Sequence, residues 1–164
     1  MQFFNVFEKF NVIEYDRESF IRSMALYTTS DEDIKRMLEA ATAVKENSYS
    51  PYSHFRVGAC ILCKDGSIYA GTNVENASYP AGTCAERGAI MNAFAHGAKG
   101  EFVSILLTSD QENEFISPCG FCRQALVEFG NLEVIMTNKK GELKRLHLMT
   151  DLLPLAFTPA ALTA

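Results

Sequence analysis

Three cysteines stand at the beginnings of two segments that the sequence predicts to be helical. Cys84 lies at the start of T-C-A-E-R-G-A-I (83–90), and Cys119 and Cys122 lie in S-P-C-G-F-C-R-Q (117–124). The latter two, at positions i and i+3, share one face of their helix. The N-terminus of a helix has unpaired N–H groups and a partial positive charge, which favour the thiolate form of cysteine. A fold that brings these two helix starts together would make a site of three thiolates.

Three thiolates are a ligand set suited to zinc, which binds sulfur at about 2.3 Å. Three protein ligands leave one tetrahedral position open, as in catalytic rather than structural zinc sites. Each part also has another interpretation. Cys84 can be a small buried hydrophobic residue, and Thr83 and Glu86 fit the two ends of a capping box. C-x-x-C alone is equally typical of a redox motif or of half a structural metal site.

The two segments together are more specific than either alone. A metal ligand, any residue and Glu, followed later by P-C-x-x-C, is the signature of zinc-dependent deaminases, in which Cys can replace His as the first ligand. Here C-A-E is followed, after 31 residues, by P-C-G-F-C. Zinc lowers the pKa of bound water toward about 7, and Glu86 can lie beside that water as a proton shuttle without binding the metal. We expect one zinc ion held by Cys84, Cys119 and Cys122.

Two arginines adjoin these segments. Three thiolates and one Zn²⁺ leave a net negative charge, which makes the metal a poorer Lewis acid. Arg87 and Arg123 are candidates to offset that charge by bonding thiolate sulfur. The alternative is that both form ion pairs at the surface.

The rest of the pattern predicts an α/β fold. Apolar residues recur at helical spacing after Ser30, a good N-cap, and two apolar runs around K-D-G-S (64–67) predict a hairpin. Ser117 is expected to cap the second cysteine-bearing helix, with Pro118 in its first position and Gly130 at its end. The expected order is helix 30–47, loop 48–53, strands 55–63 and 68–74, helix 83–94, strand 102–108, helix 117–130, and strands 132–137 and 142–148. Helices that follow strands imply a mixed sheet covered on both faces.

The length of 164 residues fits one domain of ordinary size. We expect residues 30–164 to form that domain. Residues 1–29, in which 18–27 fit a short helix, are expected to be an N-terminal extension without an assigned function.

Charge and cysteine content restrict the partners. The formal net charge is −5 and no basic run stands out, which argues against a nucleic-acid partner and for a small molecule. No apolar run approaches the length of a membrane span, and the N-terminus lacks the basic start and cleavage site of a secretory signal. Five cysteines, an odd number, favour metal binding or catalysis in a reducing compartment over a disulfide framework. We therefore expect a cytoplasmic protein with no membrane partner.

The motifs resemble those of cytidine deaminases of the small, three-cysteine, homotetrameric class. The resemblance extends from about Ser48 to Phe157 and rests on P-Y-S-H-F-R-V-G-A, N-V-E-N-A-S-Y, C-A-E-R, S-P-C-G-F-C-R-Q and L-L-P-L-A-F. It implies a three-layer α-β-α sandwich with a mixed five-stranded sheet. It also implies a homotetramer that deaminates cytidine and deoxycytidine hydrolytically to uridine and deoxyuridine, a step of pyrimidine salvage. One departure is Arg56, which stands where proline is common in the family and is expected to change only the stiffness of its loop.

The resemblance further implies a set of substrate-binding residues: Phe55, Asn73, Glu75, Asn76, Tyr79, Ala85 and Phe157. Asn73 and Glu75 would hold the ribose hydroxyls, in a pocket lined by the motif that ends at Tyr79. Phe55 would lie against the pyrimidine and the Ala85 backbone would contact the base, while Phe157 would reach the site of a neighbouring subunit. Without the resemblance, Asn73 and Glu75 would be interpreted as turn residues after a strand.

Three alternatives remain at this level. A deaminase acting on a polynucleotide would need a basic groove with stacking aromatic residues, which the net charge disfavours. A deaminase acting on an amino-nucleoside antibiotic is expected to lack N-V-E-N-A-S-Y. A non-catalytic zinc module would need a fourth protein ligand, and Cys60 or Cys63 would have to supply it. These two cysteines lie three residues apart on a predicted strand, so their side chains are expected to point to opposite faces and not to bind one ion.

Overall fold

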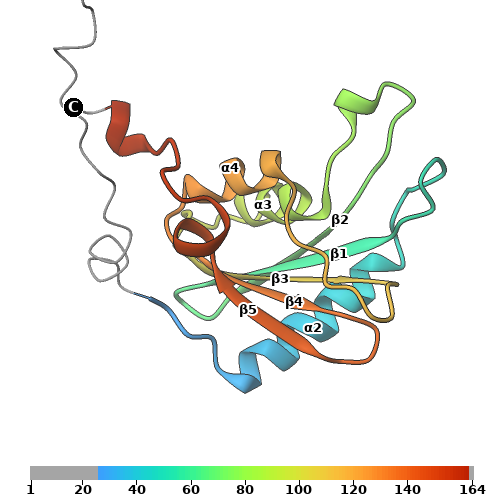
Figure 1. Cartoon of the computed structure of the whole chain (residues 1–164), viewed down its shortest axis with the longest axis horizontal. Coiled ribbons are helices and arrows are strands. Elements are labelled where there is room, and N and C mark those ends of the chain that lie inside the picture. The colour runs from blue at the N-terminus through green and yellow to red at the C-terminus, as the bar shows by residue number, and fades with distance from the viewer. Residues whose placement is uncertain (1–25, 163–164) are drawn as a thin grey trace, which may run out of the picture.

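A mixed sheet of five strands organises residues 26–162, the part of the chain that the computed structural model describes (Figure 1). The strands are β1 (Val57–Cys63), β2 (Ile68–Thr72), β3 (Phe102–Ser109), β4 (Glu133–Thr137) and β5 (Leu143–His147). Their order in the sheet is β2-β1-β3-β4-β5, with β3 and β4 parallel and all other neighbours antiparallel. The predicted mixed sheet and the predicted hairpin of β1 and β2 are confirmed.

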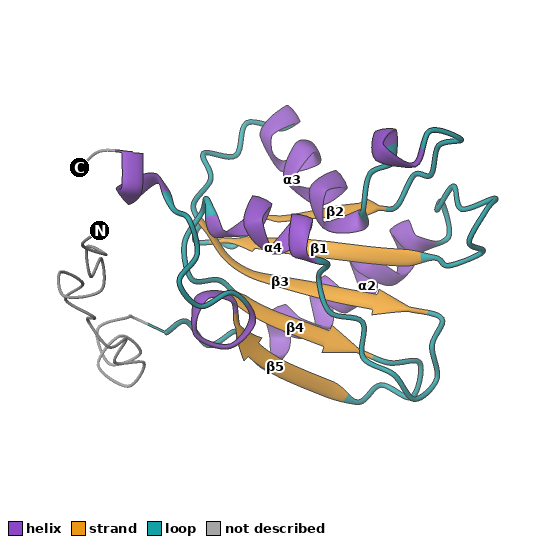
Figure 2. Ribbon diagram, turned by 45° about the horizontal axis from the view of Figure 1, so that its top comes forward, coloured by secondary structure: helices purple, strands orange, loops and turns teal. Residues whose placement is uncertain are grey.

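Helices cover both faces of this sheet, so the predicted three-layer sandwich is confirmed (Figure 2). Helix α2 (Asp31–Lys45) packs on one face, and α3 (Ala85–Ala95) and α4 (Gly120–Val127) lie on the other. Along β1 the side chains alternate between the two cores: Cys60 belongs to the α2 side, and Ile61 and Cys63 belong to the side of α3 and α4. Cys60 and Cys63 therefore point to opposite faces, as expected from strand geometry.

Two glycines allow the helices to lie very close to the sheet. A Cβ atom at Gly71 would lie 2.1 Å from the backbone nitrogen of Ala89 in α3. At Gly58, it would lie 2.0 Å from the Ala41 carbonyl oxygen in α2. A larger residue at Gly71 would push α3 away from β2 and would move the cysteine-bearing start of that helix.

The starts of the cysteine-bearing helices differ from the prediction. Ser117 does not cap α4: Cys119 is the N-cap, and its carbonyl oxygen accepts the first helical hydrogen bond from the Arg123 N–H at 2.9 Å. The Ser117 hydroxyl and the Pro118 carbonyl oxygen instead accept hydrogen bonds from the Arg123 guanidinium group. This interaction keeps residues 117–118 outside the helix, so the expected position of Pro118 was also wrong.

The capping box at the start of α3 does not form either. Cys84 is the N-cap, and its carbonyl oxygen accepts from the Gly88 N–H at 3.0 Å. Both backbone groups of Thr83 are occupied by an extended bridge to Val74, with two hydrogen bonds of 2.9 Å. Glu86 is thus released from a capping role. By contrast, Ser30 caps α2 as predicted and accepts from the Asp33 N–H at 3.1 Å.

The segment that precedes α2 is held against strands β4 and β5. The buried Glu133 carboxylate accepts hydrogen bonds from the Thr29 N–H and hydroxyl, each at 2.7 Å. Arg145 pairs with Glu133 at 2.7 Å and donates to the Thr29 carbonyl oxygen at 2.9 Å. The helix expected over 18–27 lies outside the described residues except for its last two positions, which are not helical. No helix within residues 26–162 has the length and apolarity needed to cross a membrane.

Candidate active site

The starts of α3 and α4 bring three cysteine sulfurs together. The Sγ atoms of Cys84, Cys119 and Cys122 all lie within 4.8 Å of one another, and those of Cys84 and Cys119 are 4.0 Å apart. Sulfurs that share a tetrahedral zinc at about 2.3 Å lie roughly 3.8 Å from each other. The cluster therefore needs only a small contraction to bind zinc, and the predicted convergence of the two helix starts is confirmed.

Without a metal, the cysteines of the cluster share their protons unequally. A hydrogen bond from Cys122, together with contacts from Arg87 and Cys119, lowers the pKa of Cys84 to about 5 despite the opposing effect of burial. The pKa of Cys122 is raised, because its thiol donates to Cys84 and is buried. The cluster thus already stabilises one thiolate, and metal binding would release the remaining protons.

Glu86 lies on the first turn of α3 and is only 4% exposed. Burial raises the pKa of its carboxyl group to about 7, and the charge on Cys84 adds to this increase. Its side chain also interacts with the thiol of Cys122. A carboxyl group that exchanges a proton near neutral pH therefore lies directly beside the sulfurs of Cys84 and Cys122.

Arg87 follows Glu86 and contacts both the sulfurs and the pocket wall. One terminal nitrogen donates to the Gly82 carbonyl oxygen at 3.2 Å, and the guanidinium carbon lies 4.5 Å from the centre of the Phe121 ring. The Cys84 and Cys122 sulfurs raise the pKa of Arg87 although burial opposes the effect. Within the described residues, its Nε is buried without a hydrogen-bond partner. A donor left unpaired beside a sulfur cluster suits thiolate ligands, so the residues present fit a bound zinc ion.

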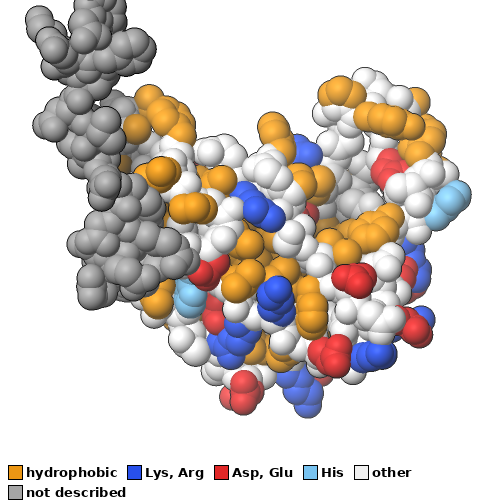
Figure 3. All heavy atoms as spheres, in the orientation of Figure 1, with side chains coloured by type: hydrophobic (Ala, Val, Ile, Leu, Met, Phe, Trp, Pro, Cys, Tyr) orange, Lys and Arg blue, Asp and Glu red, His pale blue; other side chains and the backbone are white. Residues whose placement is uncertain are grey.

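A cavity of about 710 Å³ opens beside the sulfurs. Its lining comes from the loop before β1, the segment between β2 and α3, and the start of α4, and it includes Asn73, Glu75, Cys84, Arg87 and Phe121. Figure 3 shows the hollow beside the projecting loop that Figure 1 draws in yellow-green, with hydrophobic side chains along that loop. The size fits a ligand of a few rings, and the mixture of apolar walls with few polar groups is typical of small-molecule sites.

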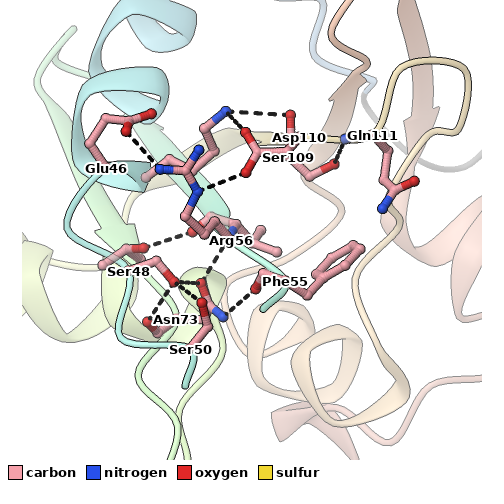
Figure 4. Close-up of polar contacts among 12 residues, drawn as sticks. Glu46, Ser48, Ser50, Phe55, Arg56, Asn73, Ser109, Asp110 and Gln111 are labelled. Carbon is pink, nitrogen blue, oxygen red and sulfur yellow. Dashed lines mark hydrogen bonds and ion pairs between the residues drawn. The ribbon is translucent and has the colours of Figure 1, made fainter. Parts of the chain in front are cut away.

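Asn73 and Glu75 lie in this cavity with their side chains held by the loop before β1 and by the first residue of that strand. The Asn73 Oδ1 accepts from the Ser48 hydroxyl at 2.6 Å and from the Val57 N–H at 2.9 Å, and its Nδ2 donates to the Phe55 carbonyl oxygen at 2.8 Å (Figure 4). These contacts fix the orientation of the amide, because only the oxygen can accept two donors. Within the described residues, one of the two hydrogens on the Asn73 Nδ2 makes a hydrogen bond, which leaves the second as a donor for a ligand.

The Glu75 carboxylate presents an acceptor in the same cavity. Its Oε2 accepts from the backbone N–H groups of Tyr52 and Ser53 at 2.9 and 3.2 Å, and its Oε1 accepts from the Ser53 hydroxyl. The hydrogen bond from Ser53 is the main cause of a pKa for Glu75 below its ordinary value. Glu75 is therefore ionised at neutral pH. It is partly exposed to solvent, which also favours the charged form.

Comparison with known proteins assigns this site to a family. The family model described as "Cytidine and deoxycytidylate deaminase zinc-binding region" matches residues 31–138, which include all three cysteines and Glu86. The chain belongs to this deaminase family. Zinc is accordingly the metal for which the cysteine cluster is built.

Curated relatives and solved structures agree with this assignment. The chain is 39% identical over 128 residues to the cytidine deaminase of Sporosarcina psychrophila, covering 77% of this chain and 92% of that one. It is 44% identical over 106 residues to a probable cytidine deaminase of Dictyostelium discoideum, covering 65% of this chain and 71% of that one. The crystal structure of cytidine deaminase from Burkholderia pseudomallei superposes with a TM-score of 0.71 at 42% identity, covering 79% of this chain and all of that one.

The deaminase-family residues predicted from the sequence fall into two groups in space. Asn73, Glu75, Asn76, Tyr79 and the zinc-site residues Cys84 and Arg87 line the cavity. The residues outside its lining are Phe55, Ala85, Glu86, Cys119, Cys122, Arg123 and Phe157. Of these, Ala85 and Glu86 are buried on the first turn of α3, and Phe55 packs partly buried against the core.

Arg123 has a different set of contacts from those predicted. Its Nε donates to the Pro118 carbonyl oxygen at 2.8 Å, and its two terminal nitrogens donate to the Leu152 carbonyl oxygen and to the Ser117 hydroxyl. The guanidinium group thus ties the Cys119 loop to the π-helical turn Leu148–Leu152. The contact that sequence analysis assigned to it, a bond to thiolate sulfur, stays a prediction.

Several residues that line the cavity were not identified as site residues from the sequence motifs. They are Tyr52, Ser53, Pro80, Gly82, Thr83 and Phe121. Phe121 was identifiable in principle, because an aromatic residue between two metal ligands at the start of a helix must lie near the metal. The contact of Ser53 with Glu75, by contrast, joins positions 22 residues apart, and no local pattern encodes it.

Proposed function

We propose that this protein catalyses the zinc-dependent hydrolytic deamination of cytidine and deoxycytidine to uridine and deoxyuridine, a step of pyrimidine salvage. The observation that carries the proposal is the placement of Glu86 beside the sulfurs of Cys84 and Cys122, at a cavity that is lined by Cys84, Asn73 and Glu75. One part of this site suits the exchange of an amino group for a hydroxyl group. The other part suits the hydroxyl groups of a sugar.

Zinc bound to the cysteines would act as a Lewis acid that lowers the pKa of water. The Glu86 carboxylate accepts a proton from the attacking water and delivers it to the ring nitrogen N3 of the pyrimidine. The water oxygen bonds to C4 as this first proton leaves it, and Glu86 then transfers the second proton of that water to the amino group, so that the C4–N bond breaks and ammonia leaves. Arg87, which lies against Cys84 and Cys122, offsets the negative charge of the thiolates.

The remaining residues bind and orient the nucleoside. Asn73 donates its free Nδ2 hydrogen to a sugar hydroxyl and Glu75 accepts from one, which makes a complementary pair. Phe55 and the Ala85 backbone contact the base, and Asn76 and Tyr79 complete the sugar side. These assignments are supported by the family motifs and, for the residues that line the cavity, by their positions.

The charges in the cavity favour a nucleoside over a nucleotide. Glu75 is ionised on the sugar side, where it would repel a phosphate group. The lining contains one cation, Arg87, and that side chain is engaged with Gly82, Phe121 and the sulfurs. The phosphate of deoxycytidylate, the other substrate in the family's description, therefore finds among the lining residues no cation that is not already engaged.

We also infer that the protein is a homotetramer in which Phe157 of one copy completes the site of another. Phe157 is 61% exposed and does not line the cavity of its own chain, which supports a contact made elsewhere. A cytoplasmic location is part of the same proposal, because a reducing compartment keeps the zinc-binding cysteines as thiols.

The test is to incubate zinc-loaded protein with cytidine and to record the loss of cytidine absorbance together with the release of one ammonia per uridine formed. Deoxycytidine is expected to react as well, whereas deoxycytidylate and free cytosine are expected to react poorly. Cys119→Ala, at an exposed ligand, should lose zinc and activity. The control Cys60→Ala, on the opposite side of the sheet, should retain both. An inactive zinc-loaded protein would contradict the proposal.

A further inference from the structure

A group of four charged residues, Lys45, Glu46, Arg56 and Asp110, lies around the residue that precedes β1. The Asp110 carboxylate, which follows β3, binds the Lys45 ammonium at 2.7 Å through one oxygen and the Arg56 Nε at 2.8 Å through the other (Figure 4). Arg56 also pairs with Glu46 at 2.7 Å. The group thus connects the end of α2, the end of β3 and the residue just before β1.

Arg56 lies between the two peptide groups that hold Asn73. The Phe55 carbonyl oxygen precedes Arg56 and accepts from the Asn73 Nδ2, and the Val57 N–H follows it and donates to the Asn73 Oδ1. The Asn73 amide therefore pairs with the backbone on both sides of one residue, as a strand neighbour would. Because these two contacts fix the amide, its orientation depends on the position of the backbone at Arg56.

We propose that Arg56 and Asp110 are positioning residues for sugar recognition, because they hold the backbone that orients the Asn73 amide toward the substrate. The inference rests on the proposed function, in which Asn73 donates to a sugar hydroxyl. Arg56 would then position Asn73, in addition to the effect on loop stiffness that was expected from the sequence.

The burial of Lys45 distinguishes this group from an ordinary surface ion pair. Exposed pairs usually contribute little, since water screens them and the long side chains must be immobilised. The Lys45 side chain, however, is only 9% exposed and can also reach the Ser109 carbonyl oxygen at 3.5 Å. Lys45 thereby fixes the Asp110 carboxylate, and Arg56 binds a partner that is already in place. Hydrogen bonds from Arg56 and Lys45 outweigh partial burial and lower the pKa of Asp110, so the carboxylate is charged at neutral pH.

The test compares Arg56→Met with Arg36→Met. Both arginines pair with an aspartate and are of similar exposure, 38% for Arg56 and 45% for Arg36, but Arg36 pairs with Asp33 on α2 and has no contact with residues 55–57. Arg56→Met leaves the pair of Lys45 and Asp110 intact, so the fold should persist. Steady-state kinetics are measured with cytidine and with 2′,3′-dideoxycytidine, which lacks both ring hydroxyls.

Arg56→Met is expected to raise KM for cytidine about fivefold to tenfold, as a weakened hydrogen bond would, with kcat changed less than about twofold. The preference for cytidine over the dideoxynucleoside should fall by a similar factor. In an Asn73→Ala background, Arg56→Met should add little, because residues that act through one contact are not additive. Arg36→Met should change none of these values.

Three results would overturn the inference: an unchanged KM, an unchanged preference between the two nucleosides, or a full additional effect in the Asn73→Ala background. Failure of the proposed function would look different, because the wild-type protein would then not deaminate cytidine at all. A lower melting temperature of Arg56→Met with an unchanged preference for cytidine over the dideoxynucleoside would show that Arg56 contributes to stability alone.

Discussion

The sequence allowed two roles for Glu86, and the structure distinguishes between them. From sequence it fits both a proton shuttle and one end of a capping box, and the structure removes the second interpretation, because Cys84 is the N-cap without a side-chain bond. A carboxyl group buried to 4% exposure without a capping role is costly to keep. Such groups persist where they perform chemistry.

Replacing Glu86 by Gln should therefore leave the fold and the zinc content intact while it abolishes proton transfer. We expect kcat for cytidine to fall by about 10²–10⁴, the usual contribution of a general acid–base group. The melting temperature should be unchanged or higher, since a neutral amide is easier to bury than a carboxylate. Zinc content, melting temperature and kcat are measured on one preparation. Near-normal turnover with one zinc per chain would contradict the assignment.

Phe121 is an exposed aromatic residue for which the fold offers no structural reason. Its ring lies over the Arg87 guanidinium group and lines the cavity. Phe121→Ala is expected to raise KM for cytidine by roughly threefold to tenfold, through the loss of apolar surface and of a cation–π contact. Phe121→Leu, which keeps the apolar surface, should recover most of the loss. Equal KM values for all three proteins would show that the ring does not contact substrate.

At the scale of helices and strands, the sequence predicted those elements that are specified by a local pattern of apolar, polar and turn residues. The strands were identifiable because they are apolar and bounded by turn residues, and α2 because Ser30 caps an amphipathic run. The start of α4 was predicted wrongly from the sequence because Arg123 donates hydrogen bonds to the Ser117 hydroxyl and the Pro118 carbonyl oxygen. The same guanidinium group also donates to the carbonyl oxygen of Leu152, which lies 29 residues away along the chain. A local sequence pattern carries no information about such contacts.

Strands β4 and β5 hold the segment before α2 through Glu133, and this attachment should depend on pH. Hydrogen bonds from Arg145 and Thr29 outweigh burial and lower the pKa of Glu133 below its ordinary value of 4.5. A carboxyl group with a lowered pKa in the folded state stabilises the protein above pH 4.5, and this contribution is lost as the pH falls through the lowered pKa.

Glu133→Gln should accordingly be less stable than wild type at pH 7, and the difference in melting temperature should narrow as the pH falls below 4.5. Melting temperatures of both proteins at pH 7 and at acidic pH provide the measurement. In an Arg145→Met background the difference at pH 7 should shrink, because the carboxylate has lost its partner. A difference independent of pH would mean that the charge on Glu133 is not what stabilises this attachment.

At the scale of the whole molecule, the site is assembled from segments that only the fold brings together. The loop before β1, the segment after β2 and the starts of α3 and α4 meet at one cavity. The sequence supplied the zinc ligands and Glu86 because their spacing reflects helix starts. It supplied Asn73 and Glu75 only through the family resemblance, since their partners Ser48, Ser53 and Val57 belong to the loop before β1 and to the start of that strand.

The most demanding prediction concerns several copies of the chain. Large apolar side chains exposed on a single chain include Tyr79, Phe121, Leu155 and Phe157, and exposed apolar surface of this kind marks interfaces. If Phe157 completes a neighbour's site, then Phe157→Ala should raise KM for cytidine although the chain that carries the change retains its own Glu86. Glu86→Gln, in turn, should be inactive although it retains Phe157.

Mixed oligomers of these two variants separate a shared site from a self-contained one. Co-expressed Phe157→Ala and Glu86→Gln chains would combine an intact Glu86 in one copy with an intact Phe157 in the next, so some sites would regain the wild-type KM. Kinetics of the co-purified oligomer should then show a low-KM component that neither variant shows alone, and light scattering should give the mass of four chains. If each chain instead uses its own Phe157, every active site in the mixture would keep the raised KM of Phe157→Ala. That result, or a fully active monomer, would remove the shared site.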